Sequence, residues 1–183
     1  MKKTVLAVLV SSTILASFSA VAEGWRVLPI LSDKNMKLEP TLALTLSRVD
    51  PDARNINTAT AYGIDFNFNC GLIQDPKNRI RTHLNISRSE KAGLEVVAYE
   101  LSPRYTVPLG NGLSVGAGPS LAMFQLDQTN FSESYFGVGV AAGVNYRAGA
   151  LYAGADLRVH NTSTERGTDY DNVTVGAKLG INF

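Results

Sequence analysis

The sequence predicts an all-β protein, an eight-stranded antiparallel up-and-down transmembrane β-barrel. Three observations lead to this prediction. The first 22 residues have the pattern of an export signal. The rest of the chain contains eight segments in which apolar and polar residues alternate, and it has no apolar run of about 20 residues, the length of a membrane-spanning helix. Such a chain is either a soluble periplasmic protein or an outer-membrane barrel, and the two faces of the strands decide between them.

Residues 1–22 are predicted to be a cleaved signal peptide. Lys2 and Lys3 precede an apolar run over 4–18, and the small residues Ala20 and Ala22 stand just before Glu23. This order of charge, apolar run and small residues is what a signal peptidase requires. We therefore expect residues 23–183 to form an outer-membrane barrel domain, in which the aperiodic stretch 23–36 is a periplasmic N-terminal extension.

Composition excludes several classes of protein. At 183 residues the chain is long enough for one domain, and 45% hydrophobic against 18% charged residues is too apolar for a disordered chain. A formal net charge of +1 provides no basic field, so we expect no nucleic-acid partner. The single cysteine, Cys70, excludes an intramolecular disulfide.

The first four alternating segments span 38–46, 62–68, 79–86 and 97–107. The first sets leucines against threonine and alanine, and the second sets tyrosine, isoleucine and phenylalanine against glycine, aspartate and asparagine. The third and fourth carry charge on their second face, from Arg79, Arg81, His83, Glu100 and Arg104. Each segment has the period of two that is typical of a strand with two different environments.

The last four segments span 113–123, 136–146, 151–159 and 173–183. In the fifth and sixth, the second face consists almost entirely of glycine, alanine, serine and asparagine. The seventh and eighth place Asp156, Arg158 and Lys178 on that face. Pro119 stands inside the fifth segment, where it cannot donate a ladder hydrogen bond, so we expect a local bulge or kink there.

The composition of the two faces favours a membrane barrel. None of the eight apolar faces carries a charge, whereas the opposite faces mix charges with many small residues. Glycine is a poor strand residue where it meets water. In the lumen of an eight-stranded barrel, which side chains just fill, small residues make room for larger ones. The apolar face is therefore predicted to meet lipid, which is the reverse of a lipocalin-like barrel.

The connections predict the orientation of the barrel. Those at 69–78, 108–112 and 147–150 are assigned to the periplasm, together with both termini. Those around 50–52, 90–93, 127–133 and 161–171 are polar and mostly longer, as external loops are. Four aromatic residues fall on the lipid face at the periplasmic ends and are predicted to form an interfacial girdle, namely Phe68, Tyr105, Tyr146 and Phe183.

The charged residues on the inward face are predicted to form an ion-pair network in the lumen. Its members are Asp65, Arg79, Arg81, His83, Glu100, Arg104, Asp156, Arg158 and Lys178. We expect Asp65 to lie near Arg81 and His83, with Glu100 facing the same pair. Asp156 is expected to reach Lys178 on the adjacent strand. Because buried charges must be paired and an eight-stranded lumen has no continuous channel, this network is interpreted as a plug and not as an ion path.

By these features the chain resembles the small outer-membrane β-barrels of Gram-negative bacteria, which include the transmembrane domain of outer membrane protein A and the opacity-type surface antigens. The most specific part is the closing strand over 173–183, because family members end in an alternating strand with a terminal phenylalanine. The resemblance implies that the barrel-assembly machinery reads Leu179, Ile181 and Phe183. Lys178 departs from the pattern, because that position often holds glycine. The resemblance also implies contact with outer-membrane lipid and lipopolysaccharide.

The predicted function is that of a structural or surface component of the outer membrane. We expect a monomer without catalysis, cofactor or metal, whose external loops contact host or envelope partners. One alternative is a lipid A-modifying enzyme that uses His160, Ser163 and Glu165 near the last external loop, where some barrels of this size hold a histidine and a serine. A second alternative is a narrow pore.

Overall fold

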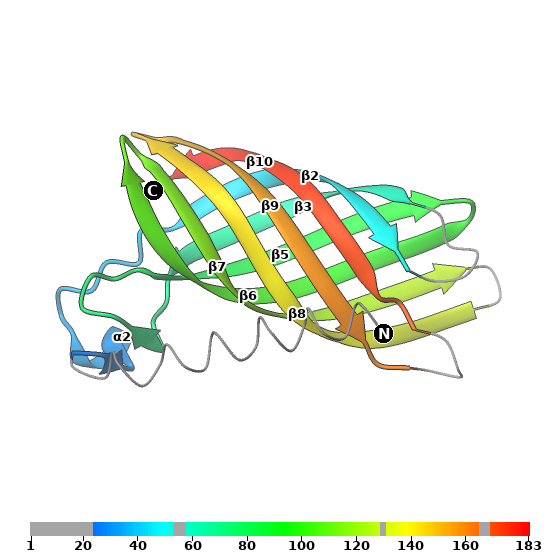
Figure 1. Ribbon diagram of the computed structural model, residues 1–183, viewed down its shortest axis with the longest axis horizontal. Helices are drawn as coiled ribbons and strands as arrows, with labels where there is room; N and C mark the ends of the chain where they lie inside the picture. The colour runs from blue at the N-terminus through cyan, green and yellow to red at the C-terminus, as the bar shows by residue number, and fades with distance from the viewer. Residues whose placement is uncertain (1–23, 53–57, 129–130, 165–168) are drawn as a thin grey trace.

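The alternating segments form long strands that close into one antiparallel barrel (Figure 1). The computed structural model describes residues 24–52, 58–128, 131–164 and 169–183. In chain order the barrel strands are β2 (Thr41–Pro51), β3 (Ala59–Asn69), β5 (Ile80–Lys91), β6 (Leu94–Gly110), β7 (Leu113–Gln128), β8 (Phe131–Ala148), β9 (Leu151–Thr162) and β10 (Asn172–Asn182). Each strand pairs with its neighbours in the sequence order. The predicted fold class, an eight-stranded antiparallel up-and-down barrel, is confirmed.

The last strand closes the barrel on the first. Leu42 of β2 lies opposite Ile181 of β10, and Leu46 lies opposite Ala177. The backbone N–H of Phe183 also donates to the carbonyl of Pro40 over 3.0 Å. Closure satisfies backbone groups that an open sheet edge would leave exposed. Within the described residues, no helix has the length and apolar character needed to cross a bilayer.

The two ends of the barrel differ. At the turn end, Asn111–Gly112 joins β6 to β7, Gly149–Ala150 joins β8 to β9, and the C-terminal Phe183 lies nearby. At the loop end, residues 52–58 follow β2 and residues 163–171 follow β9. The loop-end connection between β5 and β6 is the two-residue turn Ala92–Gly93, and both residues have positive φ angles, as in the hairpin turns that match strand twist.

The strands at the loop end are longer than the sequence analysis predicts. The expected connection at 127–133 is mostly strand, since β7 continues to Gln128 and β8 begins at Phe131. The expected connection at 90–93 shrinks in the same way, because β5 continues to Lys91. The apolar outward face of each strand ends before the strand does, but backbone pairing continues beyond it. The pattern therefore detects the lipid-facing part of each strand and misses its extension.

Of the bulge or kink expected at Pro119, the bulge is wrong. Leu101 pairs with Leu121 and Tyr105 pairs with Ala117, so the register of β6 and β7 is the same on both sides of the proline. This register sets Pro103 opposite Pro119, and the two missing N–H donors share one position in the ladder. The register shifts instead near the turn end, between Pro108 and Gly110.

Residues of the predicted N-terminal extension pack with the connection between β3 and β5. The short strand β1 (Arg26–Val27) pairs with β4 (Ile73–Gln74), and the one-turn helix α2 (Pro29–Ser32) follows β1. We refer to residues 24–38 and 70–79 together as the N-terminal subdomain. It lies beside the turn end of the barrel, where Figure 1 shows α2 next to a short strand arrow.

Candidate functional site

The lumen holds nearly all of the charged side chains that the strands bury, so we treat it as the candidate functional site. Its contents form three layers. The turn-end layer contains Asn67, Arg81, Asn145, Arg147 and Tyr152. The central ion network contains Asp65, His83, Glu100, Arg104, Asp156, Arg158 and Lys178. The loop-end cluster contains Val96, Ala122, Phe124, Leu126, Tyr135 and Tyr170.

One half of the central ion network is centred on Lys178 of β10. Its ammonium nitrogen lies 2.6 Å from a carboxylate oxygen of Asp156 and 3.3 Å from one of Asp65. The ring of His83 lies 3.2 Å from the Asp65 carboxylate. Asp156 also accepts a hydrogen bond of 2.6 Å from Arg104 on the far side of the lumen. Two carboxylates and two cations thus form a chain from β3 to β6.

The other half is centred on Glu100 of β6. One oxygen of its carboxylate lies 2.9 Å from Nη1 of Arg158 on β9, and the other accepts a hydrogen bond of 2.9 Å from the hydroxyl of Ser120. Arg104 connects the two halves, since its Nη2 lies 4.0 Å from Glu100. Strands β6 and β9 are separated in the sheet by β7 and β8, so the Glu100–Arg158 pair spans the lumen.

Charge in the central ion network is balanced. Three acidic residues (Asp65, Glu100 and Asp156) face three basic residues (Arg104, Arg158 and Lys178), and every one of these residues is buried. Removing such groups from water costs several kcal/mol per ion, which paired geometry offsets. The ion pairs therefore hold non-adjacent strands at fixed positions across the barrel.

Some of the predicted contacts in the lumen differ from those observed. The structure brings Asp65 to His83 and Asp156 to Lys178, as expected. Glu100, however, does not meet Arg81 or His83, because its partners are Arg158 and Ser120. Sequence spacing predicts which residues share the inward face, but strand tilt brings together residues from strands that are not adjacent.

Arg79 does not belong to the lumen network. β5 begins one residue later, and Asp75 binds both the backbone N–H and the guanidinium of Arg79 over 2.6 Å. The guanidinium then lies over the outward-facing ring of Tyr105, 4.7 Å from its centroid. The alternation of β5 does not extend to Arg79, because this residue is part of the connection.

The turn-end layer is built around Arg81 and Arg147. Arg81 donates to the side-chain oxygens of Asn67 and Asn69 and does not pair with Asp65 as expected. Arg147 donates to the same Asn67 oxygen over 3.0 Å. The guanidinium of Arg147 also lies 5.4 Å from the ring centroid of Tyr152. Amide oxygens thus accept hydrogen bonds from two arginines that have no buried carboxylate beside them in this layer.

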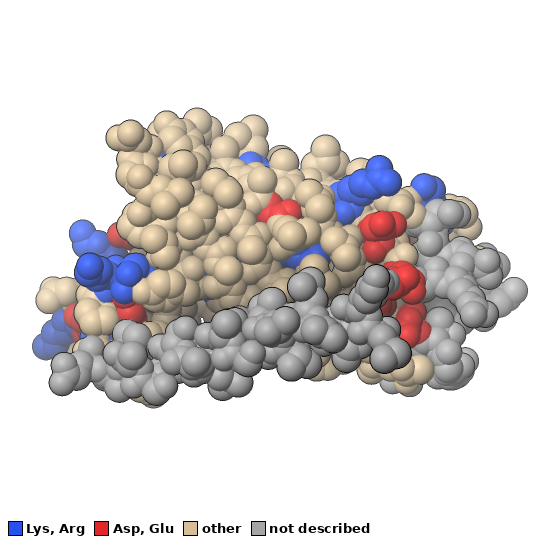
Figure 2. Space-filling model, viewed as in Figure 1, with Lys and Arg blue, Asp and Glu red and all other residues tan. Residues whose placement is uncertain are grey.

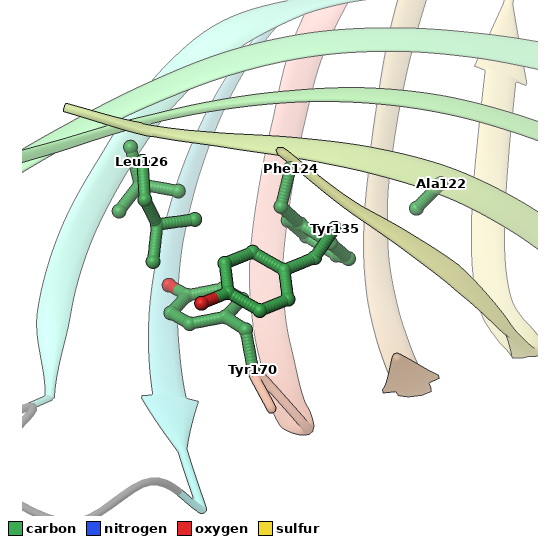
Figure 3. Close-up of a cluster of buried hydrophobic side chains, with 6 residues drawn as sticks. Ala122, Phe124, Leu126, Tyr135 and Tyr170 are labelled. Atoms are coloured by element: carbon green, nitrogen blue, oxygen red, sulfur yellow. The ribbon is translucent and has the colours of Figure 1, made fainter. Parts of the chain in front are cut away.

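The loop-end cluster fills the opposite mouth of the lumen with apolar and aromatic side chains. Figure 3 shows Phe124 and Leu126 pointing inward from β7, with Tyr135 and Tyr170 packed against them. The Phe124 and Tyr170 rings lie 5.2 Å apart, and Tyr170 is 2% exposed. The sequence analysis missed this cluster. Extending the inward phase of the fifth segment past Met123 would have found Phe124 and Leu126.

Of the three residues of the enzymatic alternative, the structure describes His160 and Ser163 and does not bring them together. His160 points into the lumen, where its Nε2 lies 2.8 Å from the Ser120 hydroxyl. Ser163 instead binds the backbone of Phe136 in β8, just beyond the β8–β9 ladder. Glu165 lies outside the described residues. Among those residues there is also no group of three or more histidine, cysteine, aspartate or glutamate side chains that could hold a metal ion.

The outer surface of the barrel carries an apolar belt. Leu44, Ile64, Val140 and Leu179 are among its exposed residues, and charged side chains gather mainly at the two ends of the molecule (Figure 2). The four aromatic residues of the predicted girdle lie on the outward phase at the turn end, as do Leu179 and Ile181 of the predicted assembly signal. Phe183 is 69% exposed. An outer face of this kind suits contact with hydrocarbon.

Comparison with known proteins identifies similar structures. No model of a known protein family matches the chain, and neither does any curated protein. Neisserial surface protein A is similar with a TM-score of 0.54 at 13% identity, covering 79% of this chain and 95% of that one. The N-terminal β-barrel domain of Pseudomonas aeruginosa OprF is similar with a TM-score of 0.53 at 15% identity, covering 80% of this chain and 100% of that one.

A third similar structure is Ail, the attachment invasion locus protein of Yersinia pestis, solved with the heparin analogue sucrose octasulfate. Its TM-score is 0.52 at 12% identity, covering 81% of this chain and 100% of that one. Identities this low establish the fold alone. This chain has the fold of the small eight-stranded outer-membrane β-barrels.

Proposed function

We propose that the protein is an integral outer-membrane barrel that acts as a structural and surface component, without catalysis and with a plugged lumen. The observation that carries this proposal is the contrast between the two faces of one closed sheet. The outward face presents an apolar belt, and the inward face holds a charge-balanced network of ion pairs. A soluble barrel would place these faces the other way round.

The turn end is proposed to face the periplasm. Its β6–β7 and β8–β9 turns are two residues long, and the outward aromatic residues gather there. At the loop end, Arg48 and Arg88 stand on the outward phase just beyond the belt. Guanidinium groups at that level suit the phosphates of lipopolysaccharide. The strand extensions of β6, β7 and β8 would then project outside the cell as the surface for partners.

Neither an aqueous pore nor an enzyme is favoured by the geometry. The central ion network and the loop-end cluster occupy successive levels of the lumen along the barrel axis. Ser120 and His160 are in contact, but both are buried and the Ser120 hydroxyl donates to Glu100. A serine that donates to a carboxylate in a closed lumen has no access to a lipid substrate.

The test uses protein purified from outer membranes. We expect unheated protein to migrate faster than boiled protein in a denaturing gel, because a closed barrel resists detergent until it is heated. In planar bilayers it should give no discrete conductance steps. Lipid A mass spectra of cells with and without the protein should be identical. Equal mobility before and after heating would contradict the barrel, steps would contradict the plug, and a changed lipid A would establish an enzyme.

A further inference from the structure

The N-terminal subdomain exposes an apolar surface that the barrel does not cover. Leu31 is 81% exposed, Val27 72% and Leu72 67%, and Ile30 and Ile73 are also exposed. These side chains belong to two segments far apart in the sequence, 27–31 and 72–73. We call these five side chains the subdomain apolar surface. Large exposed apolar groups that gather in one place mark an interaction site.

Backbone hydrogen bonds join the two segments that carry this surface. In the β1–β4 ladder Val27 pairs with Ile73, and both lie on the exposed face, while their neighbours Arg26 and Gln74 lie on the covered face. The N–H of Leu28 donates to the carbonyl of Leu72 over 2.7 Å, and the N–H of Ile30 donates to the carbonyl of Gly71. The two segments that carry the five apolar side chains therefore lie side by side.

The subdomain is fixed to the barrel, so its apolar surface is not a feature of a loose tail. Gln74, fully buried, exchanges two hydrogen bonds with the backbone of Ile80 at the start of β5. The Asn69 side chain donates to the carbonyl of Lys37 over 2.8 Å. Leu28 is held in the left-handed region, at φ 51°, which costs a non-glycine residue about 1 kcal/mol or more.

Unpaired cations accompany the apolar surface. The subdomain's Asp33 and Asp75 are occupied by Arg26 and Arg79, and the adjacent Glu39 lies 3.8 Å from Arg81. Lys34, Lys37 and Lys77 are exposed and form no ion pair with any described residue. The subdomain therefore offers three free ammonium groups and no free carboxylate among its described residues.

We propose that the N-terminal subdomain is a membrane anchor that binds the anionic phospholipids of the leaflet at the turn end of the barrel. The subdomain apolar surface enters the headgroup region, and Lys34, Lys37 and Lys77 bind lipid phosphates. The subdomain lies at the turn end of the barrel, where Gln74 bonds it to the first residue of β5. An apolar face beside lysines is the pattern of interfacial membrane segments, and each lysine near an anionic surface strengthens binding. The proposal rests on the proposed membrane location and orientation.

The experiment places a fluorescent reporter on the apolar surface. Trp25 is the only tryptophan in the chain, so a Trp25→Phe, Leu31→Trp protein has a single reporter at the most exposed apolar position. The protein is purified from outer membranes and reconstituted in phosphatidylcholine vesicles with or without phosphatidylglycerol. With phosphatidylglycerol we expect reporter emission at shorter wavelength, quenching by lipid that is brominated near the headgroup, and loss of quenching by aqueous acrylamide.

Charge variants test the role of the lysines. Replacing Lys34, Lys37 and Lys77 by glutamate in the reporter protein should abolish the effect of phosphatidylglycerol. Lys91→Glu at the loop end is the matched control and should leave that effect unchanged. Quenching by acrylamide with none by brominated lipid would overturn the proposal and indicate a protein partner for this surface. Lipid quenching that does not depend on phosphatidylglycerol would overturn the recognition of anionic headgroups.

A separate measurement tests the orientation of the barrel in the membrane independently of lipid binding. Glu90 is exposed at the loop end, and Cys70 is buried. In a Cys70→Ser, Glu90→Cys protein, an impermeant maleimide should label intact cells. Absence of labelling, with normal heat-shifted mobility, would contradict the orientation. The vesicle results would then still report whether the surface binds phospholipid.

Discussion

Two ion pairs of equal length show how strongly the surroundings of a residue determine its contribution to stability. Arg158 and Glu100 lie 2.9 Å apart in the lumen, with side chains 6% and 5% exposed. Arg88 and Glu95 also lie 2.9 Å apart, but on the outer surface at the loop end, with side chains 49% and 36% exposed. Solvent screens the second pair, whereas the first is buried and screened much less.

Arg158→Met is predicted to lower the free energy of unfolding by about 3–5 kcal/mol, because it leaves Glu100 buried without its nearest cation. Arg88→Met should cost less than about 1 kcal/mol. The measurement is urea unfolding of both variants in lipid vesicles. Similar values for the two variants would mean that water reaches the lumen and screens the buried pair.

The pH dependence of Tyr170 gives a second prediction at this scale. Burial of this loop-end phenol raises its pKa to about 12, from an ordinary value of about 10. The neutral form is therefore favoured in the folded protein, and its contribution is complete below pH 10 and is lost as the pH rises to 12. Unfolding of the protein should become easier by about 2–3 kcal/mol over this interval. Tyr170→Phe should remove that part of the pH dependence, and an unchanged pH profile would contradict a buried phenol.

The element that departs most from a regular ladder is the β6–β7 pair. Pro103 and Pro119 share one position in it, and the Ser102 hydroxyl donates to the carbonyl of Pro119 over 3.2 Å. Gly118 lets the two backbones approach, since a Cβ atom there would lie 2.0 Å from the carbonyl oxygen of Pro103. The ladder tolerates two prolines because they coincide and because a glycine stands beside them.

Gly118→Ala should therefore destabilise the barrel by about 1–3 kcal/mol, as over-packing of a filled interior does. Gly116→Ala is the matched control on the same strand and face, since its Cβ would lie 3.0 Å from the side-chain hydroxyl of Thr106, which can rotate away. The comparison is made on refolding yield and urea midpoint. A larger loss of stability for Gly116→Ala than for Gly118→Ala would contradict the close approach of β6 to β7 beside the prolines.

The closing strand β10 provides the second prediction for an element. Phe183 is 69% exposed and follows the last pair of the β2–β10 ladder, so its ring adds little to stability. The resemblance to the small outer-membrane barrels leads us to expect that the assembly machinery reads Phe183 directly. Phe183→Ala should reduce the yield in outer membranes more than the yield refolded in detergent. Equal loss in both assays would make Phe183 an ordinary girdle residue.

At the scale of the whole molecule, the apolar belt defines where the membrane lies. Along β8, Val140 and Ser134 both face outward and are exposed, but Val140 lies within the belt and Ser134 lies beyond its loop-end edge. The outward face of this one strand thus extends from the hydrocarbon region into the headgroup region.

Val140→Arg should cost about 2–4 kcal/mol in lipid vesicles, and Ser134→Arg about 0–1 kcal/mol, because the cost of a lipid-facing charge falls toward the interface. Both variants are compared by urea unfolding in the same vesicles. A larger loss for Ser134→Arg would shift the belt toward the loop end. Equal small losses would indicate that this face does not meet hydrocarbon.

The sequence by itself determined the fold class, the strand faces and the closure. Alternation is a local property of period two, so it is visible in the chain without knowledge of distant contacts. It set Asp65, His83, Arg104, Asp156 and Lys178 on the inward face. It also paired the last segment with the first, because a barrel must remove both sheet edges.

Only the tertiary structure decided which side chains contact each other inside the barrel. Tilt of the strands joins Glu100 to Arg158 across the lumen, and the turn around Asp75 removes Arg79 from it. The loop-end cluster depends on Tyr170, which reaches Phe124 from the connection after β9. The subdomain apolar surface depends on the pairing of Val27 with Ile73. These contacts join residues far apart in the chain, and their geometry is set by strand tilt and by turns that carry no periodic signal.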